Sequence, residues 1–328
     1  MRLKRGSILI IALWLVAVLT VLAVAVSRHL SIELRLVRRR LDLARAQAMA
    51  EGGIRYALLL LERDAQQEQQ GQPGPTPPAD WLGDDWAQAS EALAFEAGAV
   101  SAVTGSVSLA ITDEERRLGL NAAEAAQLTA LGLSPAAAQA IVDYWDPADP
   151  AEEDRSAAPP YAPKNGPLRT LEELRLIPAV RQELESQPTL RPLLDTETTV
   201  YLPQAAMNVN TASEAVLAAV GMPADLRASV AAFRTTTGAE EPRYFYEADG
   251  QLQSTVPFVA IDELRAFKAG YPPLGTVSQT FTVTASASLA REGRTYTIRA
   301  VVRRSADCPA VQETPRAFEL CVLAWNES

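Results

Sequence analysis

Uninterrupted apolar residues dominate the start of this chain. Residues 7–27, SILIIALWLVAVLTVLAVAVS, contain no charged side chain. A helix rises about 1.5 Å per residue, so this stretch is about 30 Å long, the thickness of a bilayer's hydrocarbon core. The apolar core of an ordinary secretory signal is shorter, about 7 to 15 residues. The pattern therefore predicts a transmembrane helix over 7–27.

A helical period of apolar residues continues over residues 28–70. Apolar residues recur there at alternating spacings of four and three, which forms one apolar seam on an α-helix. The seam consists of Leu30, Leu34, Val37, Leu41, Ala44 and Ala48. The pattern fades into a Pro/Gly/Gln-rich loop over 66–78. We expect one helix about 95 Å long, its outer half covering its own sheet and its inner half packing on neighbouring chains.

Alternating apolar and polar residues predict strands on both sides of a long helical middle. The segment VSLAITDEERRLGLN alternates and then turns at Asp113-Glu114. Near the C-terminus two alternating runs flank Glu292-Gly293 as a hairpin, and FELCVLAW adds a further strand. We expect an α+β fold, in which a sheet domain of residues 79–120 and 271–328 is interrupted by an all-α insertion over 121–270.

The predicted insertion contains an internal duplication. The segment LNAAEAAQLTALGLSPAAAQAIVDYW recurs as VNTASEAVLAAVGMPADLRASVAAFR, with Asn121 aligned to Asn210. Each copy is expected to begin with this Asn as a helix N-cap. A helix, a Gly-containing turn, a second helix and a later "ELR" helix follow, which gives repeats over 121–180 and 210–270. A period of about 90 residues indicates a duplicated domain and not a solenoid.

Net charge disfavours a nucleic-acid partner. The 328 residues include 30 basic and 40 acidic side chains, for a net charge of −10, whereas nucleic-acid binders rely on Lys and Arg. The two helical hairpins resemble the helix-hairpin-helix of DNA-binding proteins, so a membrane-anchored DNA-binding protein of the competence type is the alternative function. The hairpins lack the G-x-G spacing and contain Pro135 and Pro223, which favours a purely structural use.

Basic residues flank both ends of the predicted span. Arg2, Lys4 and Arg5 precede it, and six arginines follow it between residues 28 and 45. The positive-inside rule therefore does not decide the orientation, and the arginines after the span are suited to lipid headgroups. We place the body outside the cytoplasm because of the N-terminal signal and the cysteines.

The two cysteines, Cys308 and Cys321, lie close together in the sequence. In an oxidising compartment we expect them to form a disulfide, which would stabilise the fold by about 3 kcal/mol. The alternative is a pair of buried free thiols.

Acidic residues crowd one Pro-rich segment, DYWDPADPAEEDRSAAPPY. Carboxylates at irregular spacing suit Ca²⁺, which accepts six to eight oxygen ligands, although the EF-hand order is missing. The candidate ligands are Asp143, Asp146, Asp149, Glu152, Glu153 and Asp154. The alternative is a solvated acidic loop. The sequence shows no nucleophile paired with a base, so we expect neither an enzyme nor a small-molecule substrate, and an anchored hydrolase that uses this cluster is the enzymatic rival.

A short basic leader, residues 1–6, ends at Gly6 directly before the apolar span. Prepilin-type signals are cut on the cytoplasmic side after such a glycine, which here would leave Ser7 as the first residue. An uncleaved signal anchor is the alternative. Prepilins usually carry Glu at the fifth mature position, where this chain has Ile11. A carboxylate in hydrocarbon is unfavourable unless it is paired, so Ile11 predicts a subunit at the head of a filament.

These segments, taken in order, resemble the GspK-type minor pseudopilins of bacterial type II secretion. The resemblance is carried by KRGSILI, ITDEERRLGLN, IVDYWDPAD, MNVNTASEAVLAAVG and the hairpin FTVTASASLAREGRTYTIRAVVRR. It implies a long N-terminal helix on a pilin-like sheet, a large helical insertion and calcium in the globular domain. It also implies cleavage by the prepilin peptidase and N-methylation of Ser7.

The same resemblance implies where the protein acts and with what. The chain would be a single-pass protein of the inner membrane with its bulk in the periplasm. Its partners would be two other minor pseudopilins, of the I and J types, and the major pseudopilin. With them it would initiate and cap the pseudopilus that exports folded proteins across the outer membrane.

Overall fold

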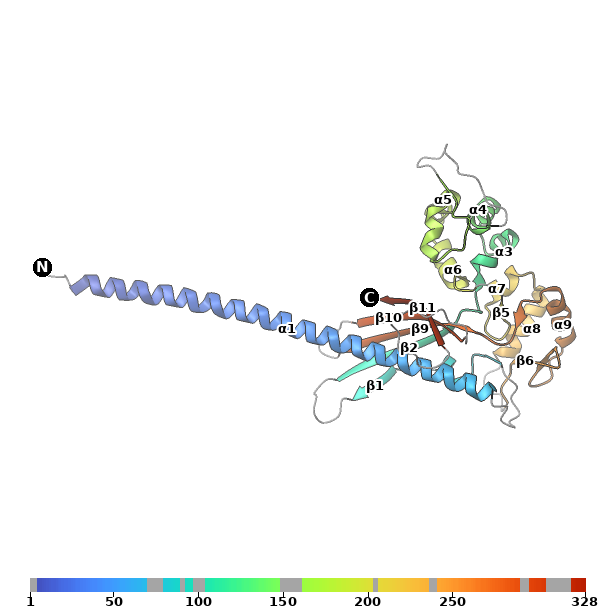
Figure 1. The fold of residues 1–328 in the computed structure, drawn as a ribbon, viewed down its shortest axis with the longest axis horizontal. Coiled ribbons are helices and arrows are strands. Elements are labelled where there is room, and N and C mark those ends of the chain that lie inside the picture. The colour runs from blue at the N-terminus through green and yellow to red at the C-terminus, as the bar shows by residue number, and fades with distance from the viewer. Residues whose placement is uncertain are drawn as a thin grey trace.

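The computed structural model describes most of the chain. The described residues are 5–69, 79–88, 92–96, 104–147, 161–202, 206–235, 241–289, 295–304 and 320–328. A long N-terminal helix projects from a body that consists of an antiparallel sheet and a helical lobe (Figure 1). The α+β class and the arrangement of helix, sheet and insertion agree with the sequence prediction.

Helix α1 runs without a break from Arg5 to Gln69, which confirms the single long helix. Its first half stands clear of the body, and its second half lies along the sheet (Figure 1). The helix extends slightly past residue 66, where a loop was predicted to begin. Gln and Glu are good helix formers, so this polar segment continues the helix although its apolar pattern has faded.

Five strands form the main antiparallel sheet of the described chain, in the order β1-β2-β9-β10-β11. Their bounds are Ala92–Glu96, Thr104–Asp113, Thr280–Leu289, Thr295–Arg304 and Leu320–Glu327. The pair β9–β10 is the predicted hairpin, with Thr295 opposite Ser288. Strand β2 pairs with β9 and places Asp113 opposite Phe281. The sheet thus joins two parts of the sequence that the helical insertion separates.

Small residues let α1 pack closely on the sheet. The buried stripe of α1, here called the sheet-facing stripe, consists of Ala46, Ala50, Ile54, Ala57 and Leu61. It packs against apolar side chains of the three central strands, among them Val107, Phe281 and Ile298. A Cβ atom added at Gly53 would lie 2.9 Å from Val107 Cγ1 and 3.1 Å from Ala285 Cβ. The helix backbone therefore touches the sheet at this point.

The apolar seam from Leu30 to Ala48 does not face the sheet. Ala44 and Ala48 are exposed, whereas Ala46 and Ala50 are buried. At about 100° per residue, Ala48 and Ala50 lie about 160° apart around the helix axis. The seam therefore runs along the side of α1 opposite the sheet, and a different stripe covers the sheet.

The helical lobe has its own hydrophobic core, which draws residues from Leu118 to Leu274. The α-helices of the lobe are α3 Ala125–Ala130, α4 Pro135–Trp145, α5 Pro178–Ser186, α6 Leu190–Glu197, α7 Glu214–Ala219, α8 Ala224–Arg234 and α9 Ile261–Gly270. Its short strands are β3 Leu118–Gly119, β4 Thr198–Thr199, β5 Met207–Asn208, β6 Phe245–Ala248, β7 Gln251–Ser254 and β8 Leu274–Gly275. Helix α2, Asp85–Gln88, lies outside the lobe and packs near α1.

The two copies of the duplication have matching geometry. Helices α3 and α7 have 6 residues each, and α4 and α8 have 11. Gly132 and Gly221 both adopt left-handed backbone angles, with φ of 105° and 84°, which favour glycine. The predicted "ELR" helix is α9 in the second copy, but in the first copy it is a 3-10 helix, Leu171–Leu176.

The prediction that Asn121 and Asn210 cap helices is wrong. The N-cap residues of α3 and α7 are Glu124 and Ser213. Instead, each Asn side chain makes two hydrogen bonds to the backbone of one distant residue. Asn121 accepts from the Leu168 N–H at 2.7 Å and donates to the Leu168 carbonyl at 2.9 Å. Asn210 does the same with Phe245, at 2.7 and 2.8 Å.

Because α1 packs closely on the sheet at Gly53 but not at Gly52, we predict that substitution of these two glycines changes the stability of the fold differently. Gly53→Ala should lower the free energy of unfolding by about 1–2 kcal/mol, because the buried neighbours must move apart. Gly52→Ala is the matched control, since a Cβ there meets nothing within 4 Å, and it should stabilise the helix by up to about 1 kcal/mol. Thermal unfolding of the full chain in detergent measures both. Equal stability of the two variants would show that α1 lies farther from the sheet.

Candidate functional site

Large apolar side chains are exposed along the first half of α1. Every Ile, Leu, Val and Trp side chain from Ile10 to Leu43 is at least 50% exposed. This helix is long and apolar enough to cross a membrane. Exposure of so many large apolar side chains marks a surface that lipid or other helices cover.

The predicted processing site lies at the start of this helix. Gly6 and Ser7 belong to the first turns of α1, and Ile11 is 59% exposed on its surface. The remaining leader residues, 1–4, lie outside the described residues. Cleavage after Gly6 stays a prediction.

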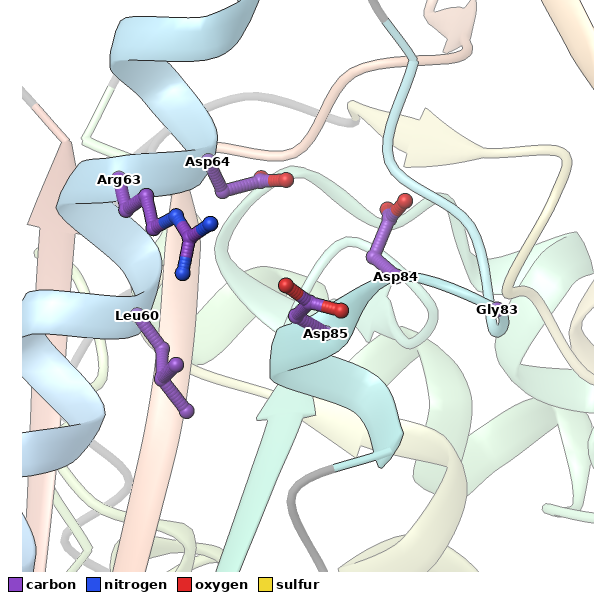
Figure 2. A pocket seen from close by; sticks show the side chains of 6 residues that line it. All are labelled: Leu60, Arg63, Asp64, Gly83, Asp84 and Asp85. Carbon is purple, nitrogen blue, oxygen red and sulfur yellow. The ribbon is translucent and has the colours of Figure 1, made fainter.

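An acidic pocket lies beside the other end of α1. The pocket has a volume of about 160 Å³ and is lined by Leu60, Arg63, Asp64, Gly83, Asp84 and Asp85. Figure 2 shows Asp64 on α1 facing Asp84 and Asp85 near the start of α2. Carboxylate oxygens of Asp64, Asp80 and Asp84 lie within 4.8 Å of one another. This spacing raises the question of a cation site.

An arginine supplies positive charge to this cluster. Arg304, at the end of β10, donates to Asp64 Oδ2 at 2.6 Å and to Asp80 Oδ1 at 2.9 Å. Its guanidinium also stacks over the Phe281 ring, 4.6 Å from the centroid. Asp84 accepts from the Trp81 N–H and from Trp86 Nε1. Each carboxylate thus has protein donors, and the cluster fastens the end of α1 to the sheet.

Asp64, Asp80 and Arg304 together form a clasp. Burial raises the pKa of Asp64, and the Arg304 guanidinium opposes this rise. Sequence reasoning missed the clasp because its members lie in three segments of the chain. The one local signal was Asp64, an acidic residue at the end of an apolar helical pattern.

A second buried polar network joins the sheet to the helical lobe. Asp113, at the end of β2, accepts from Thr211 Oγ1 at 2.5 Å and from Ser278 Oγ at 2.7 Å. Asn208, in β5, donates to Ser278 Oγ at 2.7 Å. The carboxylate of Glu115 accepts from the backbone N–H of Thr280 at 3.1 Å. Burial raises the pKa of both Asp113 and Glu115.

The predicted calcium ligands are only partly described. Asp143 lies on α4 and accepts from Gln139 Nε2 at 2.8 Å, and Asp146 is the C-cap of the same helix. Asp149, Glu152, Glu153 and Asp154 lie outside the described residues. Tyr161 follows this segment, and its pKa is raised to about 12 by burial and then by the charges of Tyr144 and Asp143. The backbone N–H of Asn165 donates to the Tyr144 carbonyl at 2.9 Å, so the described chain after this segment lies beside the end of α4.

Cys321, in β11, is buried and disulfide-bonded. Cys308 lies outside the described residues. The Cys308–Cys321 pairing therefore stays a prediction.

Arginines beside the second helical hairpin are used internally. Arg227 donates to the Met222 carbonyl at 2.6 Å, and Arg234 donates to the carbonyls of Val209 and Ala212 at 2.8 and 2.9 Å. Burial lowers the pKa of Arg234 to about 10. Guanidinium groups held in this way are poorly placed to bind phosphate, which disfavours the DNA-binding alternative.

Removal of the arginine from the clasp should destabilise the fold. Arg304→Gln leaves buried carboxylates without their cation and should lower the free energy of unfolding by about 3 kcal/mol. Without Arg304 the pKa of Asp64 rises further. A carboxyl group whose pKa is higher in the folded state than its unfolded value of 3.8 favours folding when it is protonated, at low pH. This contribution to the free energy of unfolding is lost as pH rises above 3.8. The deficit should therefore grow from about pH 4 to about pH 7.

Arg299→Gln is the matched control for the clasp, because Arg299 is exposed on the same strand. It should change the free energy of unfolding by no more than about 0.5 kcal/mol at either pH. Urea unfolding at both pH values measures the two variants. A pH-independent effect of Arg304→Gln would contradict the electrostatic explanation of the clasp.

Comparison with known proteins gives a match in structure only. No family model matches the chain, and no curated protein does. The fold is similar to that of a chain in the crystal structure of the GspK-GspI-GspJ complex from the type 2 secretion system of enterotoxigenic Escherichia coli. The TM-score is 0.56 at 16% sequence identity, and the match covers 89% of this chain and 99% of that chain. The chain described here therefore has a GspK-like fold, as its sequence predicted.

Proposed function

We propose that this chain is a GspK-type minor pseudopilin of a bacterial type II secretion system. It sits at the tip of the pseudopilus and, with other minor pseudopilins, initiates and caps the assembly that exports folded proteins across the outer membrane. The observation that carries the proposal is the fold match, which spans 99% of a chain taken from a complex of three Gsp proteins. The order of motifs along the sequence supports it independently.

The N-terminal helix supplies the anchor. Residues 7–27 cross the inner membrane, and the bulk of the chain lies in the periplasm. The prepilin peptidase cuts after Gly6 and leaves the amine of Ser7, which is then methylated. Ile11 occupies the position at which prepilins usually carry a glutamate, and a glutamate buried in the membrane would require a partner amine. A subunit with no subunit above it has no such amine to meet, so an apolar side chain suits the first position in the filament.

The exposed seam of α1 supplies the surface for assembly. It lies opposite the sheet-facing stripe, so one helix can pack on its own sheet and on other helices at the same time. Ala44 and Ala48 within the seam are small and exposed, and small residues let helices approach closely. We assign this seam to the helices of the I- and J-type minor pseudopilins and of the major pseudopilin.

The helical lobe supplies the cap. It lies at the end of the molecule away from the free end of α1 (Figure 1). A subunit stacked farther from the membrane would have to occupy this space. The role needs no catalysis.

We also propose that the acidic segment binds Ca²⁺. The donor chemistry fits, because Asp143 and Asp146 offer carboxylate oxygens at the end of α4, and four further carboxylates follow in the sequence. Asp143, Asp146, Asp149, Glu152, Glu153 and Asp154 would hold the ion. Bound Ca²⁺ would neutralise the repulsion among these acidic groups.

Co-expression tests the pseudopilin proposal. The full chain is produced with the prepilin peptidase and the I- and J-type minor pseudopilins. The mature chain should begin at Ser7 and should co-purify with both partners in mild detergent. Gly6→Val should retain the leader, whereas Gly52→Ala, a second glycine in α1, should be processed normally. An N-terminus other than Ser7, or a failure to bind either partner, would contradict the proposal.

Calcium binding should stabilise the full chain. At about 100 times the dissociation constant, Ca²⁺ should raise the free energy of unfolding by about 2.7 kcal/mol, and a chelator should reverse this. The double variant Asp143→Asn, Asp146→Asn should lose most of the effect. Glu185→Gln, an exposed acidic position on α5, should retain it. Thermal unfolding with Ca²⁺ and with Mg²⁺ measures the shift, and a wild-type chain unaffected by Ca²⁺ rules the site out.

A further inference from the structure

Charge is divided unevenly between two parts of the sequence. Residues 28–45, here called the neck, connect the span to Ala46, the first α1 side chain buried against the sheet. The neck carries six arginines and two acidic residues, whereas residues 46–328 carry 21 basic and 38 acidic residues. A basic neck therefore stands between the membrane span and an acidic body.

Most of the neck arginines have no partner within the described residues. Arg45 pairs with Asp42 at 3.4 Å, and Glu33 pairs with His29 at 3.0 Å. No ion pair or hydrogen bond among the described residues reaches the side chains of the other five, Arg28, Arg35, Arg38, Arg39 and Arg40. All five are exposed. Arg35 and Arg39 are four residues apart, a spacing at which like charges destabilise a helix.

The arginines are concentrated away from the apolar seam of α1. At about 100° per residue, Arg28, Arg35 and Arg39 lie within about 40° of one another, on the side of the helix opposite the seam. Partner helices packed on the seam would leave these three arginines uncovered. They are therefore free to contact lipid headgroups.

Position along the axis also favours lipid. Charge begins directly after the span, and Arg28 stands about 1.5 Å beyond Ser27, within the headgroup layer. Arg35 lies about 12 Å beyond Ser27, and Arg38 to Arg40 about 16–20 Å. Tilt of the span and the length of the side chains bring these groups to within about one Debye length of the headgroups, about 8 Å at physiological salt.

We propose that the neck is an electrostatic collar for anionic phospholipid on the side of the membrane where the body lies. The guanidinium groups bind headgroup phosphates, a geometry that suits arginine. The acidic body is repelled by the same lipids, so the two effects together hold α1 upright and the body away from the surface. The inference goes beyond the proposed function, since it concerns the lipid around the span and not the partners.

Spin-labelled lipids test the collar in the full chain without any partner. The chain is reconstituted in phosphatidylcholine bilayers that contain a trace of spin-labelled phosphatidylcholine or phosphatidylglycerol. The fraction of each lipid immobilised by the protein is measured by electron paramagnetic resonance. The wild-type chain should favour phosphatidylglycerol by about threefold or more at low salt, and high salt should reduce this preference. Equal immobilisation of the two lipids by the wild-type chain would overturn the proposal whatever any variant does.

Two triple variants of equal charge change locate the effect. Arg28→Gln, Arg35→Gln, Arg38→Gln removes the three arginines nearest the span and should bring the preference close to one. Arg169→Gln, Arg175→Gln, Arg181→Gln removes three exposed arginines of the helical lobe and should leave it unchanged. A neck variant that keeps its lipid preference but no longer co-purifies with the minor pseudopilins would assign the neck to protein contacts and overturn the collar. Failure of the wild-type chain to find those partners would leave the lipid result intact, so the two proposals fail separately.

Discussion

Close packing of α1 on the sheet is the interaction on which the rest of this structure depends. The sheet-facing stripe is rich in alanine, and Gly53 brings the helix backbone within van der Waals contact of Val107 and Ala285. Larger residues on this stripe would separate helix and sheet and would open space in a core that must be filled. Because the stripe is narrow, the opposite side of α1 remains available, and the same helix can serve the fold and an assembly surface.

Polar contacts then determine how the parts are joined. Arg304 ties Asp64 of α1 to Asp80, and Asp113 ties the end of β2 to Thr211 and Ser278. Buried polar and charged groups of this kind add little net stability when they have partners, but they are costly to leave without them. They therefore select one arrangement of helix, sheet and lobe over alternatives that bury the same apolar residues. In the proposed tip subunit, this would give the cap a fixed position relative to the anchor.

The distribution of charge along the chain also divides it into parts with different roles. The span is uncharged, the neck is basic and the body is acidic. Each part therefore suits a different environment, namely hydrocarbon, headgroups and water. In the helical lobe, by contrast, Arg227 and Arg234 do not serve as surface charges. They donate hydrogen bonds to backbone carbonyls of the lobe itself. The second hairpin, which resembles a DNA-binding motif, thus serves as a structural unit.

Local periodicity by itself determined the elements of this protein. The uncharged run, the helical seam, the alternating strands and the repeat from Asn121 to Asn210 predicted the long helix, the sheet and the duplicated insertion, since each depends on residues close in sequence. Tertiary structure alone decided which stripe of α1 meets the sheet, because both stripes are apolar and only packing separates them. It also decided that Asn121 and Asn210 bind distant backbone instead of capping helices, and that Arg304 meets Asp64. These contacts join residues between 35 and 240 positions apart, and no spacing in the sequence specifies them.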